Sequence, residues 1–135
     1  LGYAYTHPFV GRAAYGWTAE TSIYVRRGET KSGLGRTLYG ALEAVSRAQN
    51  IYSLTACIGW CEREDEHLSR NSVEFHAHMG YGPAGHFREC GYKFGKWYDM
   101  VWMEKQLAPR PDVPPEVIPF PRLDGETLRT CGVEK

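Results

Sequence analysis

The stretch Gly33-Leu34-Gly35-Arg36-Thr37-Leu38-Tyr39 follows an apolar run, Ser22-Ile23-Tyr24-Val25, and opens a segment with helical periodicity. A strand, a glycine-rich turn and a helix start can together hold a pyrophosphate. The glycines let the backbone approach the phosphates, and the first N–H groups of the helix point at the anion. A glycine pair before a helix is also common as a plain structural turn, so the run alone leaves both interpretations open.

Three further side chains have types suited to chemistry. Glu20 stands in a segment of β-forming residues, where it is either a surface carboxylate or a base that accepts a proton. His76 has apolar neighbours, which is typical of a structural histidine as well as of proton transfer. Arg12 lies in a predicted loop, where a guanidinium is either solvated or binds a carboxylate or tetrahedral oxyacid through two hydrogen bonds.

The net charge of the chain indicates which classes of partner are not expected. Sixteen acidic residues balance sixteen basic ones, so we expect neither nucleic acid nor an anionic membrane as a partner. No apolar run approaches the roughly twenty residues of a membrane-spanning helix.

The cysteines and histidines are scattered rather than paired. Cys57 and Cys61 are separated by three residues, and Cys90 and Cys131 do not complete a zinc-binding set. We therefore expect no metal site, and we interpret the cysteines as free thiols in a reducing cytoplasm.

Apolar periodicity and turn residues predict a mixed sheet with helices on its faces. The predicted strands are residues 2–6, 17–25, 52–58, 81–92 and 97–105, the last two joined as a hairpin through residues 93–96. The predicted helices run from Leu34 to about Gln49 and over a short segment that ends at Gly80. Six of the eight prolines lie in fourteen residues from Ala108 on, which predicts an extended tail, either docked or disordered.

This order of elements and several local motifs resemble the GNAT acetyl-CoA-dependent N-acetyltransferases, in particular the phosphinothricin and methionine sulfone acetyltransferase group. The matching motifs are Arg12 to Tyr15, Trp17-Thr18-Ala19-Glu20, Tyr24-Val25, Gly33-Leu34-Gly35 with Leu38-Tyr39, His76 with Gly80-Tyr81, and Gly91-Tyr92-Lys93-Phe94-Gly95-Lys96-Trp97 with Asp99. The resemblance covers residues 1 to about 107. It implies an α/β (α+β) GNAT fold, with a mixed central sheet and flanking helices. The strands and helices that begin this fold in the family would be missing.

The resemblance implies an activity and two catalytic residues. Acetyl would pass from acetyl-CoA directly to the α-amine of a small amino acid such as phosphinothricin or methionine sulfone or sulfoximine, in a ternary complex. Glu20 would act as general base, usually through water, and His76 would either assist deprotonation or protonate the leaving thiolate. None of the cysteines matches a catalytic position, which disfavours a covalent acyl-enzyme.

The resemblance also implies binding residues. The acetyl-CoA residues would be Ile23, Tyr24, Val25, Lys31, Ser32, Gly33, Leu34, Gly35, Arg36 and Asn71, and the amino-acid pocket would include Arg12, Tyr15 and Tyr24. Two positions depart from the family pattern: Thr30 replaces an arginine or glutamine before the glycines, and Ser69 replaces an asparagine, for which Asn71 is a near substitute.

The family pattern has further elements before the first strand, so we expect a GNAT domain at residues 1–107, comprising the last two thirds of the fold, followed by a tail at residues 108–135. The group tends to dimerise, and we expect a homodimer. A truncated or non-catalytic module that binds coenzyme A, or assembles with another chain, is the alternative to an enzyme.

Overall fold

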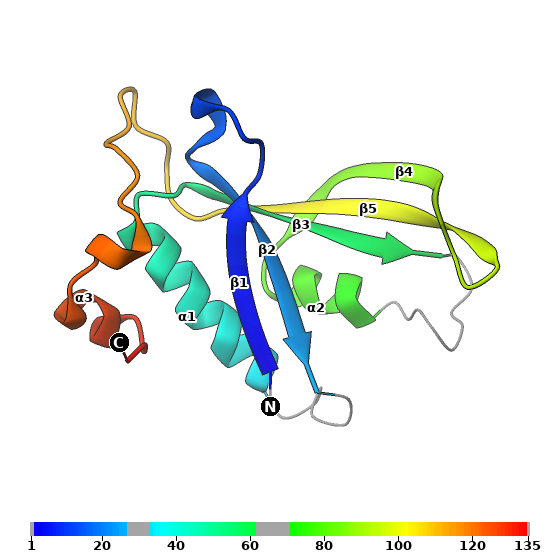
Figure 1. Cartoon of the computed structure of the whole chain (residues 1–135), viewed down its shortest axis with the longest axis horizontal. Coiled ribbons are helices and arrows are strands. Elements are labelled where there is room, and N and C mark those ends of the chain that lie inside the picture. Colours follow the sequence, from blue (N-terminus) through cyan, green and yellow to red (C-terminus); the bar gives the residue numbers. More distant parts are fainter. Residues whose placement is uncertain (1, 27–32, 62–70, 135) are drawn as a thin grey trace. The chain divides into compact units, whose positions relative to one another are not determined.

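The computed structural model describes residues 2–26, 33–61 and 71–134 (Figure 1). The chain divides into two compact units. The first unit comprises Leu1–Leu54 and Gln106–Lys135, and the second comprises Thr55–Lys105.

The strands are β1 (Gly2–Pro8), β2 (Thr18–Val25), β3 (Ser53–Trp60), β4 (Gly82–Lys93) and β5 (Lys96–Gln106), in the sheet order β1-β2-β3-β5-β4. The helices are α1 (Leu34–Ala48), α2 (Asn71–His78) and α3 (Gly125–Thr130), with short 3₁₀ turns at Ala13–Tyr15 and Phe120–Arg122. None of the helices in these ranges combines the length and the apolar character that crossing a membrane requires.

In the first unit, β1 and β2 form an antiparallel ladder that runs from the pair Gly2–Val25 to the pair Pro8–Ala19. One face of this ladder packs against α1. A Cβ atom added at Gly2 would lie 2.6 Å from the carbonyl oxygen of Tyr24 and 3.4 Å from Leu34 Cδ2, so this position has no room for a side chain. The strand predicted at residues 2–6 is confirmed as β1, which extends two residues further, to Pro8.

Helix α1 confirms the predicted span and shows which of its faces is buried. Three leucines recur at helical spacing, Leu34, Leu38 and Leu42, and they are only half-buried. The buried residues of the helix are Tyr39, Glu43, Val45 and Ser46. The Tyr39 hydroxyl donates a hydrogen bond to Thr21 Oγ1 on β2, at 3.2 Å. Burial is the main reason that the pKa of Tyr39 is raised to about 12. The phenol is therefore protonated at neutral pH and can donate this hydrogen bond.

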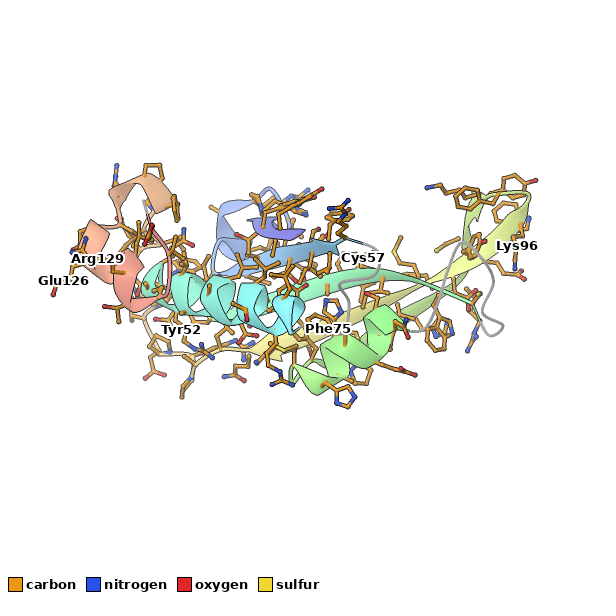
Figure 2. All side chains as sticks on the ribbon, turned by 90° about the horizontal axis from the view of Figure 1, so that it is seen from below. Tyr52, Cys57, Phe75, Lys96, Glu126 and Arg129 are labelled. Carbon is orange, nitrogen blue, oxygen red and sulfur yellow. The ribbon has the colours of Figure 1, made fainter. Side chains whose placement is uncertain are left out.

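The proline-rich tail packs on α1 and contains the short helix α3. Leu123 and Leu128 form a buried apolar cluster with Val45, and partly buried residues pack around it. Asp124 caps α3 by accepting a hydrogen bond from the backbone N–H of Thr127 at 2.7 Å. Figure 2 shows the charged side chains of Glu126 and Arg129 on the side of α3 that points away from α1. The tail is therefore docked, one of the two states expected, and α3 was not predicted.

In the second unit, β4 and β5 form the predicted antiparallel hairpin, which turns at residues 93–96. Phe94 and Gly95 have φ values of 54° and 76°, the left-handed pair that a tight two-residue turn requires. The register shifts twice along β4, between Pro83 and Gly85 and between Phe87 and Gly91. These irregularities are typical of bulges, which bend a strand and redirect its side chains.

Candidate active site

Glu20 lies on the face of β2 that points away from α1, because its neighbour Thr21 is the residue that meets Tyr39. The ladder pairs Glu20 with His7, whose Nε2 lies 3.3 Å from Glu20 Oε2. The Glu20 side chain is 19% exposed and that of His7 is 43% exposed. A carboxylate that is partly shielded but still in contact with solvent can accept a proton directly or through a water molecule.

An exposed row of aromatic rings lies on the same face as Glu20. Tyr3, Tyr5 and His7 alternate along β1, with ring centroids 6.3 Å apart for Tyr3–Tyr5 and 6.2 Å apart for Tyr5–His7. Tyr24 of β2 packs against Tyr3, with centroids 5.2 Å apart. The sequence predicts that Tyr3 and Tyr5 share a face, but only the strand register shows that this face also holds Glu20.

A pocket of about 540 Å³ lies at the end of this row, lined by Gly2, Tyr3, Tyr24, Val25 and Arg26. Its size is within the range of small-molecule sites. The pocket contains two residues predicted to bind ligand, Tyr24 and Val25. Ile23 is the register partner of Ala4 and lies on the opposite face of the ladder, toward α1.

Arg12 and Tyr15 lie in the connection between β1 and β2. Arg12 precedes the 3₁₀ turn, its N–H donates to the Val10 carbonyl at 2.8 Å, and its carbonyl accepts from the Tyr15 N–H at 3.0 Å. Both side chains are exposed, and neither lines the pocket of the first unit. Their predicted contact with an amino acid stays a prediction.

The start of α1 has the features of an anion-binding site. Gly33 has a φ of 82°, which a residue with a side chain rarely adopts, and the Thr37 N–H and hydroxyl both donate to its carbonyl at 3.1 Å. Leu34 and Gly35 lie inside the first helical turn rather than in a loop before it. That turn contains no acidic residue and carries the exposed Arg36, so nothing within it competes with an anion for the N-terminal N–H groups. Lys31 and Ser32, also predicted to bind the pyrophosphate, lie outside the described residues.

His76 belongs to the second unit, on α2, and is 3% exposed. Its Nδ1 lies 2.6 Å from the carbonyl oxygen of Ser72, which makes Nδ1 the N–H donor and leaves the lone pair on Nε2. Tyr81 and Phe75 pack edge-on against the imidazole, with ring centroids 5.1 and 5.4 Å away. Burial lowers the pKa of His76 below its ordinary value, although the hydrogen bond to Ser72 opposes this shift. His76 is therefore a neutral imidazole at pH 7.

Asn71 is the first residue of α2 and is exposed. His78, for which no role was expected, is exposed on the same helix. The predicted site residues therefore fall in both units: Glu20, Tyr24 and the glycine turn in the first, and His76 and Asn71 in the second.

The second unit holds a pocket of its own, of about 370 Å³, which the sequence did not suggest. It is lined by Cys57, Gly59, Cys90, Gly91, Tyr92, Lys93, Phe94, Tyr98, Asp99 and Met100. Its residues come from β3 and from both strands of the hairpin, so only the folded sheet places them together.

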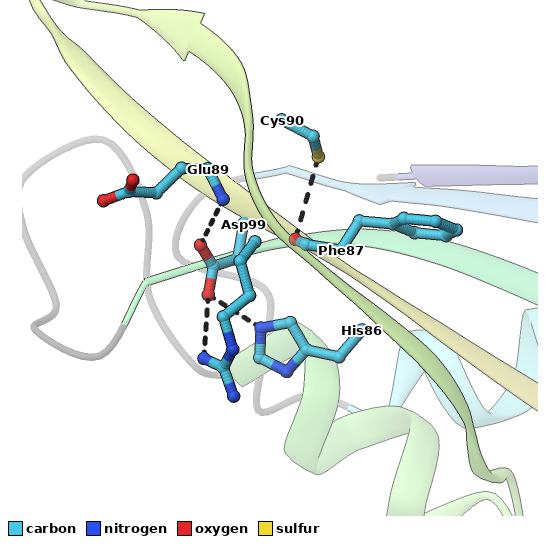
Figure 3. A network of polar contacts seen from close by, with 6 residues as sticks. His86, Phe87, Glu89, Cys90 and Asp99 are labelled. Atoms are coloured by element: carbon cyan, nitrogen blue, oxygen red, sulfur yellow. Dashed lines mark hydrogen bonds and ion pairs between the residues drawn. The ribbon is translucent and has the colours of Figure 1, made fainter.

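Asp99 in this pocket organises the irregular part of β4 (Figure 3). Its carboxylate accepts hydrogen bonds from the Glu89 backbone N–H at 2.8 Å and from His86 Nε2 at 2.7 Å, and Arg88 Nη1 lies 3.6 Å away. The Glu89 amide, followed by His86, holds the pKa of Asp99 below its ordinary value. Glu89 has a φ of 46°, which is unfavourable for a residue with a side chain. Asp99 thus stabilises a strained bulge.

Across residues 2–26, 33–61 and 71–134, no three His, Cys, Asp or Glu side chains lie together in a way that could hold a metal ion. All four cysteines lie in these ranges and are thiols rather than disulfides.

Comparisons with known proteins agree on one family. The model of the acetyltransferase (GNAT) domain matches residues 1–102. The phosphinothricin N-acetyltransferase of Streptomyces viridochromogenes is 37% identical over 114 residues, which are 84% of this chain and 58% of the relative. The L-methionine sulfoximine/L-methionine sulfone acetyltransferase of Pseudomonas aeruginosa is 33% identical over 117 residues, 84% of this chain and 62% of the relative.

Solved structures that resemble this chain include proteins with bound acetyl-CoA. A Salmonella typhimurium protein solved with its cofactor acetyl-CoA has a TM-score of 0.73 at 26% identity, covering 84% of this chain and 61% of that chain. A phosphinothricin acetyltransferase from Sinorhizobium meliloti in complex with acetyl-CoA has a TM-score of 0.66 at 29% identity, covering 78% of this chain and 54% of that chain. The chain thus spans about three fifths of the length of the curated relatives that it matches.

Proposed function

Because the chain belongs to the GNAT acetyltransferase family, we propose that it transfers acetyl from acetyl-CoA to the α-amine of a small amino acid or analogue. The phosphinothricin and methionine sulfoximine/sulfone enzymes among its relatives point to an acceptor of that type. The likeness to solved GNAT enzymes confirms the mixed α/β fold expected from the sequence. The observation that carries the proposal is the half-shielded Glu20 carboxylate, held opposite His7 on the open face of β2.

Glu20 is proposed as the general base. An amine attacks a thioester only after it loses a proton, and the Glu20 carboxylate would take that proton directly or through water. The amine nitrogen then forms a bond to the acetyl carbonyl carbon, the C–S bond breaks, and coenzyme A leaves as a thiolate that must be protonated. The transfer is proposed to be direct, with no acyl-enzyme.

His76 is proposed to assist as a proton acceptor. The sequence left two roles open, and the buried imidazole favours one of them: its lowered pKa makes it neutral at pH 7, with the lone pair on Nε2. A neutral imidazole whose N–H is hydrogen-bonded to the Ser72 carbonyl carries no proton on Nε2 to give to a thiolate, so the acceptor role is the one proposed. Protonation of the thiolate is therefore assigned to solvent or to another group.

The start of α1 is proposed to hold the pyrophosphate of acetyl-CoA. The fit rests on the left-handed Gly33, on the N-terminal N–H groups of a fifteen-residue helix and on a first turn without acidic residues. Arg36, together with Lys31 and Ser32, is proposed to add contacts to the phosphates, Ile23–Val25 to pair with the pantetheine arm through the main chain, and Asn71 to contact that arm. Arg12, Tyr15 and Tyr24 are proposed to line the acceptor pocket.

We also propose that the chain acts as a cytoplasmic homodimer. Four large rings on the β4–β5 hairpin are more than half exposed, which supports an interface between copies there: Phe87, Tyr92, Phe94 and Trp97. Light scattering on the eluted peak of a gel-filtration column measures the mass, and a mass of one chain would contradict the dimer.

The alternative is a coenzyme A-binding or assembly module without turnover. One experiment decides between the two. Thiol release from acetyl-CoA is measured with this chain against phosphinothricin, methionine sulfone and a panel of amino acids, with the full-length relative from Streptomyces viridochromogenes as positive control. Turnover with one class of acceptor supports the enzyme, whereas calorimetric binding of coenzyme A without turnover supports the module.

A further inference from the structure

Residues 115–118 of the tail contact two segments of the first unit that are far apart in the sequence. The indole N–H of Trp17 donates to the Pro115 carbonyl at 2.8 Å, and the Asn50 side-chain amide donates to the Glu116 carbonyl at 2.9 Å. Ile118 and Gln49 exchange two hydrogen bonds, one through the Ile118 N–H at 3.0 Å and one through Gln49 Nε2 at 3.1 Å. The segment therefore contacts the residue that precedes β2 and the turn that follows α1.

The tail segment is itself held in place on both sides. Before it, the Leu107 N–H donates to the Tyr52 carbonyl at 2.8 Å, and Arg110 donates to Ser53 Oγ at 2.6 Å. After it, Leu123 and Leu128 are 5% and 0% exposed in the cluster with Val45. A carbonyl fixed in this way can restrain the side chain that it binds.

Trp17 is the residue through which this restraint reaches β2. Its carbonyl oxygen accepts hydrogen bonds from the N–H groups of Tyr52, at 2.9 Å, and Ser53, at 3.4 Å, so its main chain is already held by the start of β3. The hydrogen bond from the indole N–H to Pro115 adds a third restraint, on the side chain rather than on the main chain. Trp17 immediately precedes β2 and stands three positions before Glu20.

We propose that the tail positions the general base: the Pro115 carbonyl, through Trp17, sets where β2 begins and therefore where the Glu20 carboxylate lies opposite His7. The proposal rests on the proposed role of Glu20. Displacing a reacting group by about 1 Å can lower turnover as much as 100-fold, whereas the binding of a cosubstrate elsewhere is unaffected. Trp17 and Pro115 are positioning residues in this proposal and touch no substrate.

The test compares two tail contacts of the same kind. Trp17→Phe keeps an aromatic ring but removes the N–H donor to Pro115. Asn50→Gly removes the donor to Glu116, and glycine tolerates the φ of 65° at this position, so the control loses a tail hydrogen bond that does not involve β2. Pro115→Gly is a second probe, which loosens the accepting carbonyl and leaves Trp17 intact.

For Trp17→Phe we expect kcat to fall about three- to tenfold, as for the loss of one hydrogen bond, with an unchanged KM for acetyl-CoA. Pro115→Gly should act in the same direction, and Asn50→Gly should keep the wild-type kcat. An equal loss in Trp17→Phe and Asn50→Gly, or a rise in KM without a fall in kcat, would overturn the proposal.

Two measurements test the inference independently of turnover. In Trp17→Phe, amide hydrogen exchange should quicken at residues 18–21 but not in α1, and the His7 imidazole NMR signals should shift as Glu20 moves. Wild-type exchange and unchanged His7 signals would overturn the positioning role. If the wild-type chain turns over no amine, the proposed function fails, and these two measurements still decide whether the tail sets the position of Glu20.

Discussion

Glu20 of β2 lies directly opposite His7 of β1, with 3.3 Å between Oε2 and Nε2, on the face of the ladder that α1 does not cover. The two residues are thirteen positions apart in the chain, and the strand register alone brings them together. The pair orients a carboxylate toward a row of exposed aromatic rings, which is the arrangement from which the general-base proposal follows.

Glu20→Gln removes the proton acceptor and preserves the size of the side chain. We expect kcat at neutral pH to fall on the order of 100-fold or more, because a general base typically contributes that much, while the KM for acetyl-CoA stays near the wild-type value. Steady-state thiol release measures both. Glu126→Gln, on the outer side of α3, is the matched control and should behave as wild type. Unchanged turnover in Glu20→Gln would remove this residue from the mechanism.

Gly33, immediately before α1, and Gly40, within it, are a matched pair of glycines. A Cβ would meet no atom within 4 Å at either position, but only Gly33 has a positive φ, of 82°. Gly33→Ala should therefore destabilise the chain by about 1–2 kcal/mol and raise the KM for acetyl-CoA. Gly40→Ala should stabilise it by about 0.5–1 kcal/mol, because alanine is the better helix former.

Urea unfolding and calorimetric titration with coenzyme A measure the two effects separately. If both alanine variants bind coenzyme A as the wild type does, the geometry at Gly33 does not contribute to cofactor binding.

The buried His76 makes stability depend on pH. Its pKa is lower in the folded chain than the ordinary value of 6.5, so the unfolded chain binds more protons when the pH falls below that value. The contribution of His76 is complete above about pH 6.5 and is lost as the pH falls toward the folded pKa. We expect the free energy of unfolding, measured in urea, to decrease between pH 7.5 and pH 5.

The controls for this prediction lie on the same helix. His76→Asn keeps an N–H donor near Nδ1 but cannot titrate, so it should lose this part of the pH dependence, whereas the exposed His78→Gln should retain it. Equal pH dependence in wild type and His76→Asn would show that another group causes the effect.

Leu128→Ala tests whether the tail belongs to the fold of the first unit. Leu128 is 0% exposed in the cluster with Val45 and Leu123, so truncation should cost about 2–5 kcal/mol of unfolding free energy. Val113→Ala lies in the same tail at 84% exposure and should cost less than about 0.5 kcal/mol. If the two variants unfolded at the same urea concentration, the cluster would add nothing to stability.

The helices, strands and turns of this protein can largely be predicted from short stretches of its sequence. The period of the leucines predicts α1, residues 93–96 predict the hairpin turn, and the glycine run predicts the helix start where Gly33 adopts its positive φ. The motif resemblance predicted the family that the comparisons show. These features depend on residues close together in the chain, and local sterics and apolar periodicity are sufficient to specify them.

The surroundings of the candidate site residues depend instead on how distant segments pack. The contact of Glu20 with His7 depends on strand register, and the burial of His76 depends on the packing of Tyr81 and Phe75 around it. The docking of the tail through Trp17 joins residues 98 positions apart. Prolines carry no periodicity that predicts a packing face, and contacts between distant segments form only when the apolar surfaces of the whole unit are buried together.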